Sequence, residues 1–246
     1  LGNDANGGTD LAETNFAATD QSISTPTNIF PTFTPLIKSS YVDIAEGNRL
    51  LTGNTAADGG TALTTMPSLT RGKWYIESKS IDDTGQMPQG GFHFNMATTT
   101  MYNVNGAAGF SATGGFGWNS SGGVESNLFT NITGLTSGSD GDIKQYAWDM
   151  DNGAFYVGIN NTWQNSGNPE SGASKTGSVF SFTPADYPNI GFSSSGFNSS
   201  DEGINFGDPH YANSSDAADA DGYGKFEFAP PSGYFSICTK NIAEYG

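Results

Sequence analysis

The stretch Tyr146-Ala-Trp-Asp-Met-Asp-Asn-Gly-Ala-Phe-Tyr-Val-Gly-Ile-Asn-Asn-Thr-Trp163 has the pattern of two β-strands joined by a tight turn. Asn152 and Gly153 tolerate the positive φ angles of a short hairpin, and the flanking aromatic and β-branched residues suit a pleated, half-buried surface. The stretch therefore predicts an antiparallel hairpin with strands at 142–148 and 154–159. Such a hairpin favours an all-β fold.

Further strand signals recur along the chain with turn residues between them, which is the spacing typical of sandwiches and barrels. Residues 72–80 alternate so that Trp74, Ile76 and Ser78 share one face. Shorter predicted strands lie at 48–52, 91–96, 108–112, 187–192, 203–207 and 233–238, and 187–192 and 203–207 are interpreted as a pair. No helix longer than two turns is predicted. The sequence thus predicts an all-β, two-sheet antiparallel β-sandwich.

Polar loops and an irregular start complete the predicted organisation. Gly/Ser/Asn-rich loops at 119–126, 134–141, 164–176, 193–202 and 211–221 indicate a loop-rich rim. Residues 1–40 have no hydrophobic period, and their prolines and scattered aromatic residues predict an extended segment that lies along another module like a strap. We therefore divide the chain into a lead-in at 1–40 and a sandwich domain at 41–246. Because it opens at Leu1 and not at Met, we expect a processed product or part of a longer chain.

The charge balance excludes one class of partner. Nine Lys and Arg residues stand against 25 Asp and Glu residues, so the formal net charge is −16 and nucleic acid is repelled. No apolar run approaches the ~18 residues of a membrane span, so no membrane insertion is expected. Cys238 is the only cysteine, which excludes an internal disulfide and favours a buried small hydrophobic residue.

Four segments, in order, resemble SPRY-like modules of tailed-bacteriophage proteins, especially those of marine phages. They are 72–77, 142–153, 204–208 and 221–234, with the sequences GKWYIE, DIKQYAWDMDNG, INFGD and DGYGKFEFAPPSGY. Residues 1–4 and 15–36 are similar to the connector that often follows a laminin-G or concanavalin-like module. The resemblance implies a concanavalin-like jelly-roll sandwich in a virion protein. At 156–161 the usual aromatic-Lys-Asn-Gly turn is replaced, so no loop contact is carried over there.

The resemblance also carries expectations about function. It implies a non-enzymatic module of a tail fibre or other appendage on the virion surface, which attaches to a host cell-surface glycan or protein through its loops. An architectural role is the alternative, as a capsid-decoration or fibre-shaft domain that packs against copies of itself or other virion proteins. A polysaccharide depolymerase is a more distant alternative. Because phage fibres are usually trimeric, the resemblance implies a homotrimer.

Loop tryptophans are the candidate ligand-binding residues. Sugar recognition uses an exposed aromatic face with amide or carboxylate partners beside it. Trp118 and Asn119 lie in a Gly-rich run, which favours an exposed platform, and Trp163 stands beside Asn161 and Gln164. The alternative for both tryptophans is a structural one, in which they cap the end of the sandwich.

Catalytic and metal-binding patterns are weak. Asp149 and Asp151 share a strand face, as a hydrolytic pair could, but Asp before Asn-Gly is a normal turn signature. His93 and His210 have no Gly-x-Ser-x-Gly elbow with them, so we predict no catalytic residues.

Calcium is the better metal hypothesis, because hard cations need several oxygen ligands. Weak candidate ligands are Asp140 and Asp142 in one loop and Asp219 and Asp221 in another. No EF-hand pattern closes either set, and solvated acidic loops are the alternative. We therefore expect no metal or other cofactor.

Overall fold

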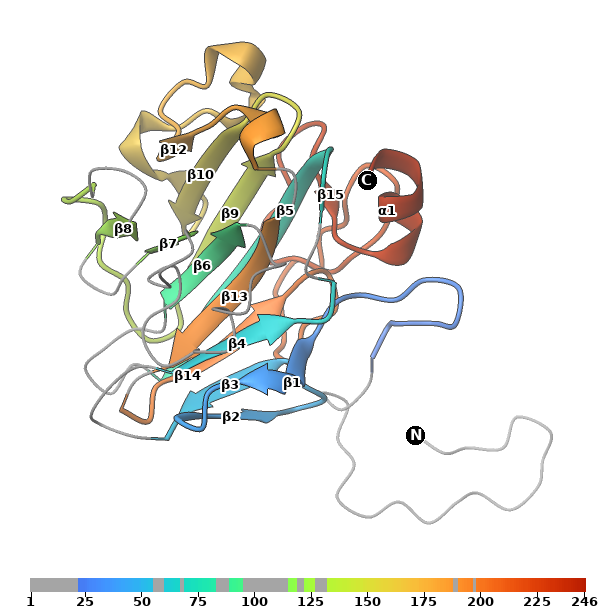
Figure 1. Ribbon diagram of the computed structural model, residues 1–246. Coiled ribbons are helices and arrows are strands. Elements are labelled where there is room, and N and C mark those ends of the chain that lie inside the picture. Colours follow the sequence, from blue (N-terminus) through green and yellow to red (C-terminus); the bar gives the residue numbers. More distant parts are fainter. Residues whose placement is uncertain are drawn as a thin grey trace.

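A computed structural model describes residues 22–54, 60–66, 69–82, 89–94, 115–118, 122–126, 132–187, 190–196 and 198–246. Within them, two largely antiparallel β-sheets pack face to face (Figure 1). The predicted two-sheet antiparallel β-sandwich is therefore confirmed. In this part of the chain, no helix has the length and apolar character needed to cross a bilayer.

The smaller sheet has six strands in the order β1-β4-β13-β6-β7-β8. Their bounds are Phe33–Lys38 for β1, Gly60–Thr64 for β4, Ile190–Gly196 for β13, Gln89–Phe94 for β6, Gly115–Trp118 for β7 and Val124–Ser126 for β8. All neighbours along this path are antiparallel.

The larger sheet follows the order β11-β10-β9-β5-β14-β3-β2. These strands are Thr162–Trp163 (β11), Ala154–Ile159 (β10), Ile143–Asp149 (β9), Lys73–Asp82 (β5), Asp201–Asn205 (β14), Leu50–Gly53 (β3) and Val42–Ala45 (β2). Two short strands join it at the side: β12 (Phe180–Ser181) pairs with β10, and β15 (Phe235–Ser236) pairs parallel to β5. Three 3₁₀ turns, η3 (Gln164–Ser166), η4 (Pro169–Ser174) and η5 (Pro184–Asp186), and the two-turn helix α1 (Thr239–Tyr245) complete the described elements.

The hairpin predicted from the opening stretch is confirmed as β9 and β10, with Asp149 opposite Ala154. The backbone N–H of Gly153 donates to the Asp149 carbonyl at 2.9 Å, and Gly153 has φ 73°. A Cβ at this position would lie 2.0 Å from the carbonyl oxygen of Phe182, so both the conformation and the close approach require glycine.

The central strands of the larger sheet are buried on both faces. On the inner face, Trp74, Ile76 and Ser78 are fully buried, as their predicted shared face requires, and Trp74 and Ile76 belong to the main core. On the outer face, Tyr75 and Tyr156 pack against residues of the C-terminal segment, which Figure 1 shows in orange to red beside β5. The second small core thus consists of Tyr75, Ala147, Ala154, Tyr156, Phe226 and Tyr234. Cys238 is fully buried, as expected.

The predicted pairing of 187–192 with 203–207 is wrong. β13 lies between β4 and β6 in the smaller sheet, whereas β14 lies between β5 and β3 in the larger one. The short connection after residue 196 crosses from one sheet to the other, so strands that are neighbours in sequence face each other across the core. The serine run 193–195, predicted as loop, is a fully buried part of β13. The predicted strand at 108–112 lies outside the described residues.

The lead-in is more closely integrated than predicted. β1 pairs with β4 in the smaller sheet, and Phe33 is fully buried in the core, so the sandwich includes residues before the predicted boundary at 40. A register shift between Phe33 and Lys38, around Pro35, removes the regular alternation that would have revealed this strand. Residues 22–32 form the strap, which we define by this range.

The turn between β10 and β11 allows a matched test of side-chain hydrogen bonding. Asn160 and Asn161 have φ 46° and 63°, as a two-residue type I′ turn requires. Asn160 also accepts from the Ile143 N–H at 3.0 Å and donates to Asp142 at 2.6 Å. Asn160→Gly is expected to lower the free energy of unfolding by about 1 kcal/mol, because these bonds are lost while φ is retained.

Asn161→Gly is the control, since glycine accepts the same conformation and no described hydrogen bond uses the Asn161 side chain. Urea denaturation of both variants makes the comparison. Equal losses in the two variants would show that the side-chain bonds of Asn160 add nothing to stability.

Candidate functional site

Trp163 is the tryptophan that solvent can reach. Its partner in the β10–β11 register is Gly158, where an added Cβ would lie 3.1 Å from Cε3 of the indole. Because Gly158 has no side chain, the indole of Trp163 can pack closely against the sheet, beside the second core. Trp163 is partly exposed, whereas Trp74, Trp118 and Trp148 are at most 1% exposed.

The segment after Trp163 forms one wall of a groove. The side chain of Asn168 caps η4 by accepting from the Glu170 N–H at 3.1 Å. The Asn168 N–H donates to the Thr176 carbonyl at 2.9 Å, which closes the loop on itself. The loop predicted at 164–176 is therefore ordered by its own polar groups.

The opposite wall is the Ala-Pro-Pro run at 229–231, and two hydrogen bonds tie the walls together. Oε1 of Glu170 accepts from the Ser232 N–H at 2.7 Å. The hydroxyl of Tyr234 donates to the Pro169 carbonyl at 3.0 Å. Because both contacts join residues far apart in sequence, only the folded chain creates this groove.

The groove has a volume of about 360 Å³, at the small end of the range for ligand pockets. Its lining residues are Trp163, Gly167, Asn168, Pro169, Glu170, Ala229, Pro230 and Pro231. An aromatic face, rigid proline walls and two polar side chains suit the recognition of a small group.

The expectation of an exposed platform at Trp118 is wrong. Trp118 lies on β7, is 1% exposed, and packs edge-on against Tyr146 at 6.3 Å between ring centroids. Gly115 and Gly117, which favoured a loop, are residues of β7, and Gly117 lies opposite Gly91 in the smaller sheet. Asn119 lies outside the described residues.

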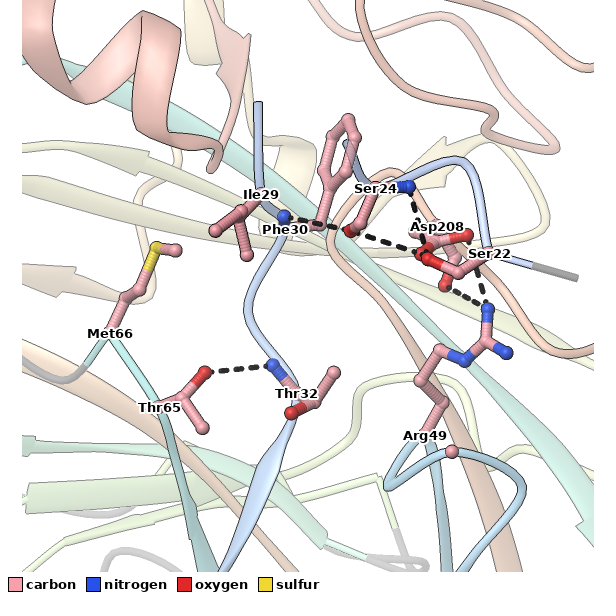
Figure 2. A pocket seen from close by; sticks show the side chains of 10 residues that line it. Ser22, Ser24, Ile29, Phe30, Thr32, Arg49, Thr65, Met66 and Asp208 are labelled. Carbon is pink, nitrogen blue, oxygen red and sulfur yellow. Dashed lines mark hydrogen bonds and ion pairs between the residues drawn. The ribbon is translucent and has the colours of Figure 1, made fainter. Parts of the chain in front are cut away.

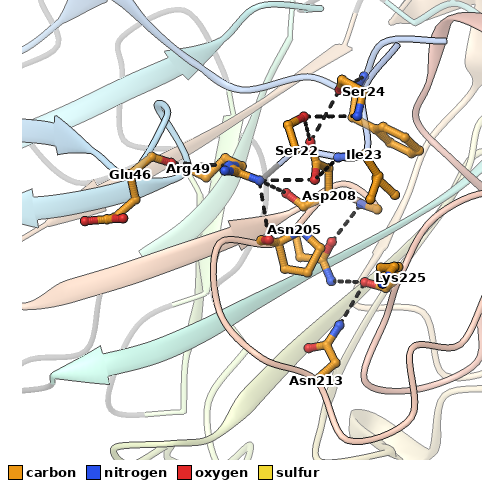
Figure 3. A network of polar contacts seen from close by, with 12 residues as sticks. Ser22, Ile23, Ser24, Glu46, Arg49, Asn205, Asp208, Asn213 and Lys225 are labelled. Atoms are coloured by element: carbon orange, nitrogen blue, oxygen red, sulfur yellow. Dashed lines mark hydrogen bonds and ion pairs between the residues drawn. The ribbon is translucent and has the colours of Figure 1, made fainter. Parts of the chain in front are cut away.

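A second recess, of about 530 Å³, lies between the strap and the sandwich (Figure 2). Asp208, 6% exposed, accepts from Arg49 at 3.1 Å, from the Ile23 N–H at 3.0 Å, and from the hydroxyls of Ser22 and Ser24. Figure 3 shows these contacts converging on Asp208. The strap already makes hydrogen bonds to Asp208. We therefore interpret the recess as part of the contact between the strap and the sandwich, and not as a ligand site.

The weak calcium candidates are engaged in local hydrogen bonds. Oδ2 of Asp142 accepts from the Ser139 N–H at 2.7 Å, and its Oδ1 accepts from Asn160 at 2.6 Å. Asp140 is exposed. Within the described residues, no three His, Cys, Asp or Glu side chains come together so that they could hold a metal ion.

Asp219 organises the C-terminal segment. It is 7% exposed and accepts five hydrogen bonds of 2.7–3.0 Å from Asp221 N, Tyr223 N, Ser236 N, Ser236 Oγ and Asn241 Nδ2. Asp221 is exposed and accepts from the Tyr245 hydroxyl at 3.0 Å. The acidic spacing that suggested an ion site is therefore explained by Asp219, whose carboxylate accepts hydrogen bonds from the surrounding loop.

Asp149 and Asp151, the two acidic residues at the hairpin turn, both accept hydrogen bonds. Asp149 is fully buried, pairs with Lys73 at 3.0 Å and accepts from Asn152 at 2.9 and 2.8 Å. Asp151 accepts from the Gly72 N–H at 2.8 Å. The bonds from Asn152 match the turn interpretation of Asp149, whereas Asp151 joins the turn to Gly72, directly before β5.

His210 is the histidine whose side chain the structure describes, and it is buried. Burial, with the positive charges of Arg49 and Lys79, lowers the pKa of His210 to about 4, so its imidazole is neutral at neutral pH. The side chain of His93 lies outside the described residues.

Glu77 is a buried polar residue that the sequence reasoning missed. Its carboxylate is fully buried and accepts from Tyr75 at 2.8 Å, and from the N–H groups of Glu227 and Phe228 at 2.8 and 2.9 Å. Asn205 donates at 3.3 Å. Burial raises the pKa of Glu77 to about 7, against the opposing effect of these hydrogen bonds. A glutamate in the middle of a strand, directly after the apolar residues Trp74, Tyr75 and Ile76, was the available signal.

Comparisons with known proteins give a structural likeness. No family model matches this sequence, and no curated protein matches it. The chain is similar to solved SPRY domains. For the SPRY domain of human HERC1, identity is 17% and the TM-score is 0.48, over 70% of this chain and 96% of that one.

Two further solved structures give similar values. A human SPRY domain has 8% identity and a TM-score of 0.49, over 72% of this chain and 98% of that chain. The Drosophila melanogaster neuralized NHR1 domain has 12% identity and a TM-score of 0.46, with the same coverage of 72% and 98%. These likenesses concern the path of the chain and not its ligands.

Proposed function

We propose that this chain is a non-enzymatic recognition module that binds its ligand in the groove at Trp163. The observation that carries the proposal is a partly exposed indole, backed by Gly158, between two walls that Glu170 and Tyr234 tie together. A groove fixed in this way needs little reordering when a ligand enters, which favours binding.

The contacts of the acidic residues support a module that recognises its ligand without catalysing a reaction. A glycoside hydrolase needs two carboxylates that face the substrate and differ in protonation. Asp149 is buried and paired with Lys73, and Asp151 holds the Gly72 N–H, so neither is available for such chemistry. Among the described residues, Glu170 is the carboxylate that lines the groove.

The biological setting of the proposal rests on the sequence resemblance. We propose that the module belongs to a surface appendage of a tailed bacteriophage, where it attaches to a host cell-surface glycan or protein. On this hypothesis it is part of the extracellular particle, contacts other virion proteins and assembles as a homotrimer. The net charge of −16 supports a ligand that is not a polyanion.

The proposal is tested with a Trp163→Phe variant. Acrylamide should quench a minor part of the wild-type tryptophan fluorescence, and that part should disappear in Trp163→Phe, because the other three tryptophans are buried. On immobilised bacterial surface glycans and on intact host cells, Trp163→Phe and Trp163→Ala should bind at least about tenfold more weakly than wild type.

Leu36→Ala is the matched control, because Leu36 is an apolar side chain that is 89% exposed on β1 and does not line the groove. It should bind as wild type does. Thermal unfolding of each variant checks that the fold is retained. Unchanged binding by a folded Trp163→Ala would refute the groove as the binding site.

A further inference from the structure

We infer that the groove at Trp163 takes a cationic group, so that its ligand presents a positively charged nitrogen to the indole face and to Glu170. The chemical class includes the side chains of Lys and Arg on a partner protein and quaternary ammonium groups. The inference rests on the proposed function, because it names the ligand chemistry of the same groove.

Glu170 supplies a fixed negative charge. Its Oε1 is held by the Ser232 N–H at 2.7 Å, while Oε2 has no partner among the described residues. No Lys or Arg in the described part of the chain forms an ion pair with it. The carboxylate is exposed, so a ligand can reach its second oxygen without breaking a contact.

The backbone of the groove offers few hydrogen-bond donors. Pro169, Pro230 and Pro231 have no N–H, and the N–H groups of Gly167, Asn168 and Glu170 already donate within the loop. The other donors of the lining residues are the backbone N–H groups of Trp163 and Ala229, the indole N–H and the side-chain amide of Asn168. An anion would need several donors, whereas an ammonium or guanidinium group brings only donors and needs acceptors.

The indole adds an attraction specific to cations. Trp is the best aromatic partner for a cation, and the interaction strengthens when the contact is partly shielded from water. Three lysines of the chain already lie over tyrosine rings: Lys73 over Tyr234 at 5.7 Å, Lys79 over Tyr211 at 5.4 Å and Lys240 over Tyr223 at 5.1 Å. Among the described residues, no such contact involves Trp163, which lines the groove and is partly exposed.

The charge of the whole chain acts in the same direction. A net charge of −16 raises the local concentration of cations and lowers that of anions at the surface. Because this field is screened by salt, cation binding should weaken as ionic strength rises.

The test uses acrylamide quenching of Trp163 in the intact chain at constant ionic strength. The probes are tetramethylammonium, Nα-acetyl-lysinamide and Nα-acetyl-argininamide as cations, methyl glucoside as a neutral sugar, and acetate as an anion. The cations should protect Trp163 from quenching, and acetate should not. Stronger protection by tetramethylammonium would identify a quaternary ammonium ligand, and stronger protection by the amides a basic side chain.

Glu170→Gln keeps an oxygen for the Ser232 N–H but removes the charge. The cation concentration needed to protect Trp163 from acrylamide should therefore rise about tenfold. Glu244→Gln on α1 makes the same charge change at an exposed position away from the groove and should have no effect.

Two outcomes separate the inference from the proposed function. Protection by methyl glucoside alone, unchanged in Glu170→Gln, would overturn the cationic ligand and retain the groove as a binding site. Absence of protection by every cation also overturns the inference. The proposed function fails separately, if Trp163→Ala binds host cells as wild type does.

Discussion

Replacing Asp219 with alanine is expected to lower the free energy of unfolding by about 3–5 kcal/mol, because five hydrogen bonds lose their acceptor together. The N–H and hydroxyl of Ser236 are buried and lose their carboxylate acceptor, and each buried donor left without a partner costs about 1–3 kcal/mol. The Asn241 side chain keeps its hydrogen bonds to Ser236. A typical domain has only about 5–15 kcal/mol of stability, so the loss is a large part of the total.

Urea denaturation followed by fluorescence measures this loss. Asp216→Asn is the control, since Asp216 is exposed, pairs with an exposed Lys225, and has a positive φ of 49° that asparagine tolerates. It should change stability by less than about 0.5 kcal/mol. If Asp219→Ala were as mild as Asp216→Asn, water would have to replace the carboxylate, and its organising role would be refuted.

Glu77 is expected to make stability fall as the pH rises from about 4.5 to about 7. Its pKa is about 7 in the fold against 4.5 in the unfolded chain, so the folded state holds a proton that the unfolded state has released. The stabilisation is fully present below pH 4.5 and is lost as the pH passes the folded value. The difference of 2.5 pH units corresponds to roughly 3 kcal/mol.

The pH dependence of stability sums over all ionisable groups, so the contribution of Glu77 is measured as the difference in stability between wild type and Glu77→Gln. Glu77→Gln is neutral at every pH, and the stability of wild type relative to Glu77→Gln should fall by roughly 3 kcal/mol between pH 4.5 and 7.5. Parallel pH profiles would contradict the raised pKa. If Glu77→Gln does not fold, NMR titration of the Glu77 carboxyl carbon in the wild-type chain gives its pKa directly.

Local patterns predicted the elements whose own residues carry the signal. β10 was predicted residue for residue, and β9 and β5 nearly so, because alternation and turn residues act within a few positions. β1 and β13 were missed or misplaced, because a register shift breaks the alternation of one and three serines make the other look like a loop. Their strand character comes from pairing with β4.

The candidate site, too, was predicted only in part from local sequence signals. Residue type and neighbours pointed to Trp163, but the same signals pointed to Trp118, which is buried under the opposite sheet. Burial depends on which strand lies opposite, and a single sequence does not contain that information. The role of Glu170 depended on Ser232, which lies 62 positions further along the chain.

Local propensity and composition are enough to specify the all-β character, the β9–β10 hairpin and the acidic charge of this protein. Three other properties depend on the folded chain: which tryptophan faces solvent, which carboxylates accept hydrogen bonds from surrounding loops, and where a groove forms. Those properties arise from contacts between segments far apart in sequence, whose energies exist only once the two sheets and the C-terminal segment have come together.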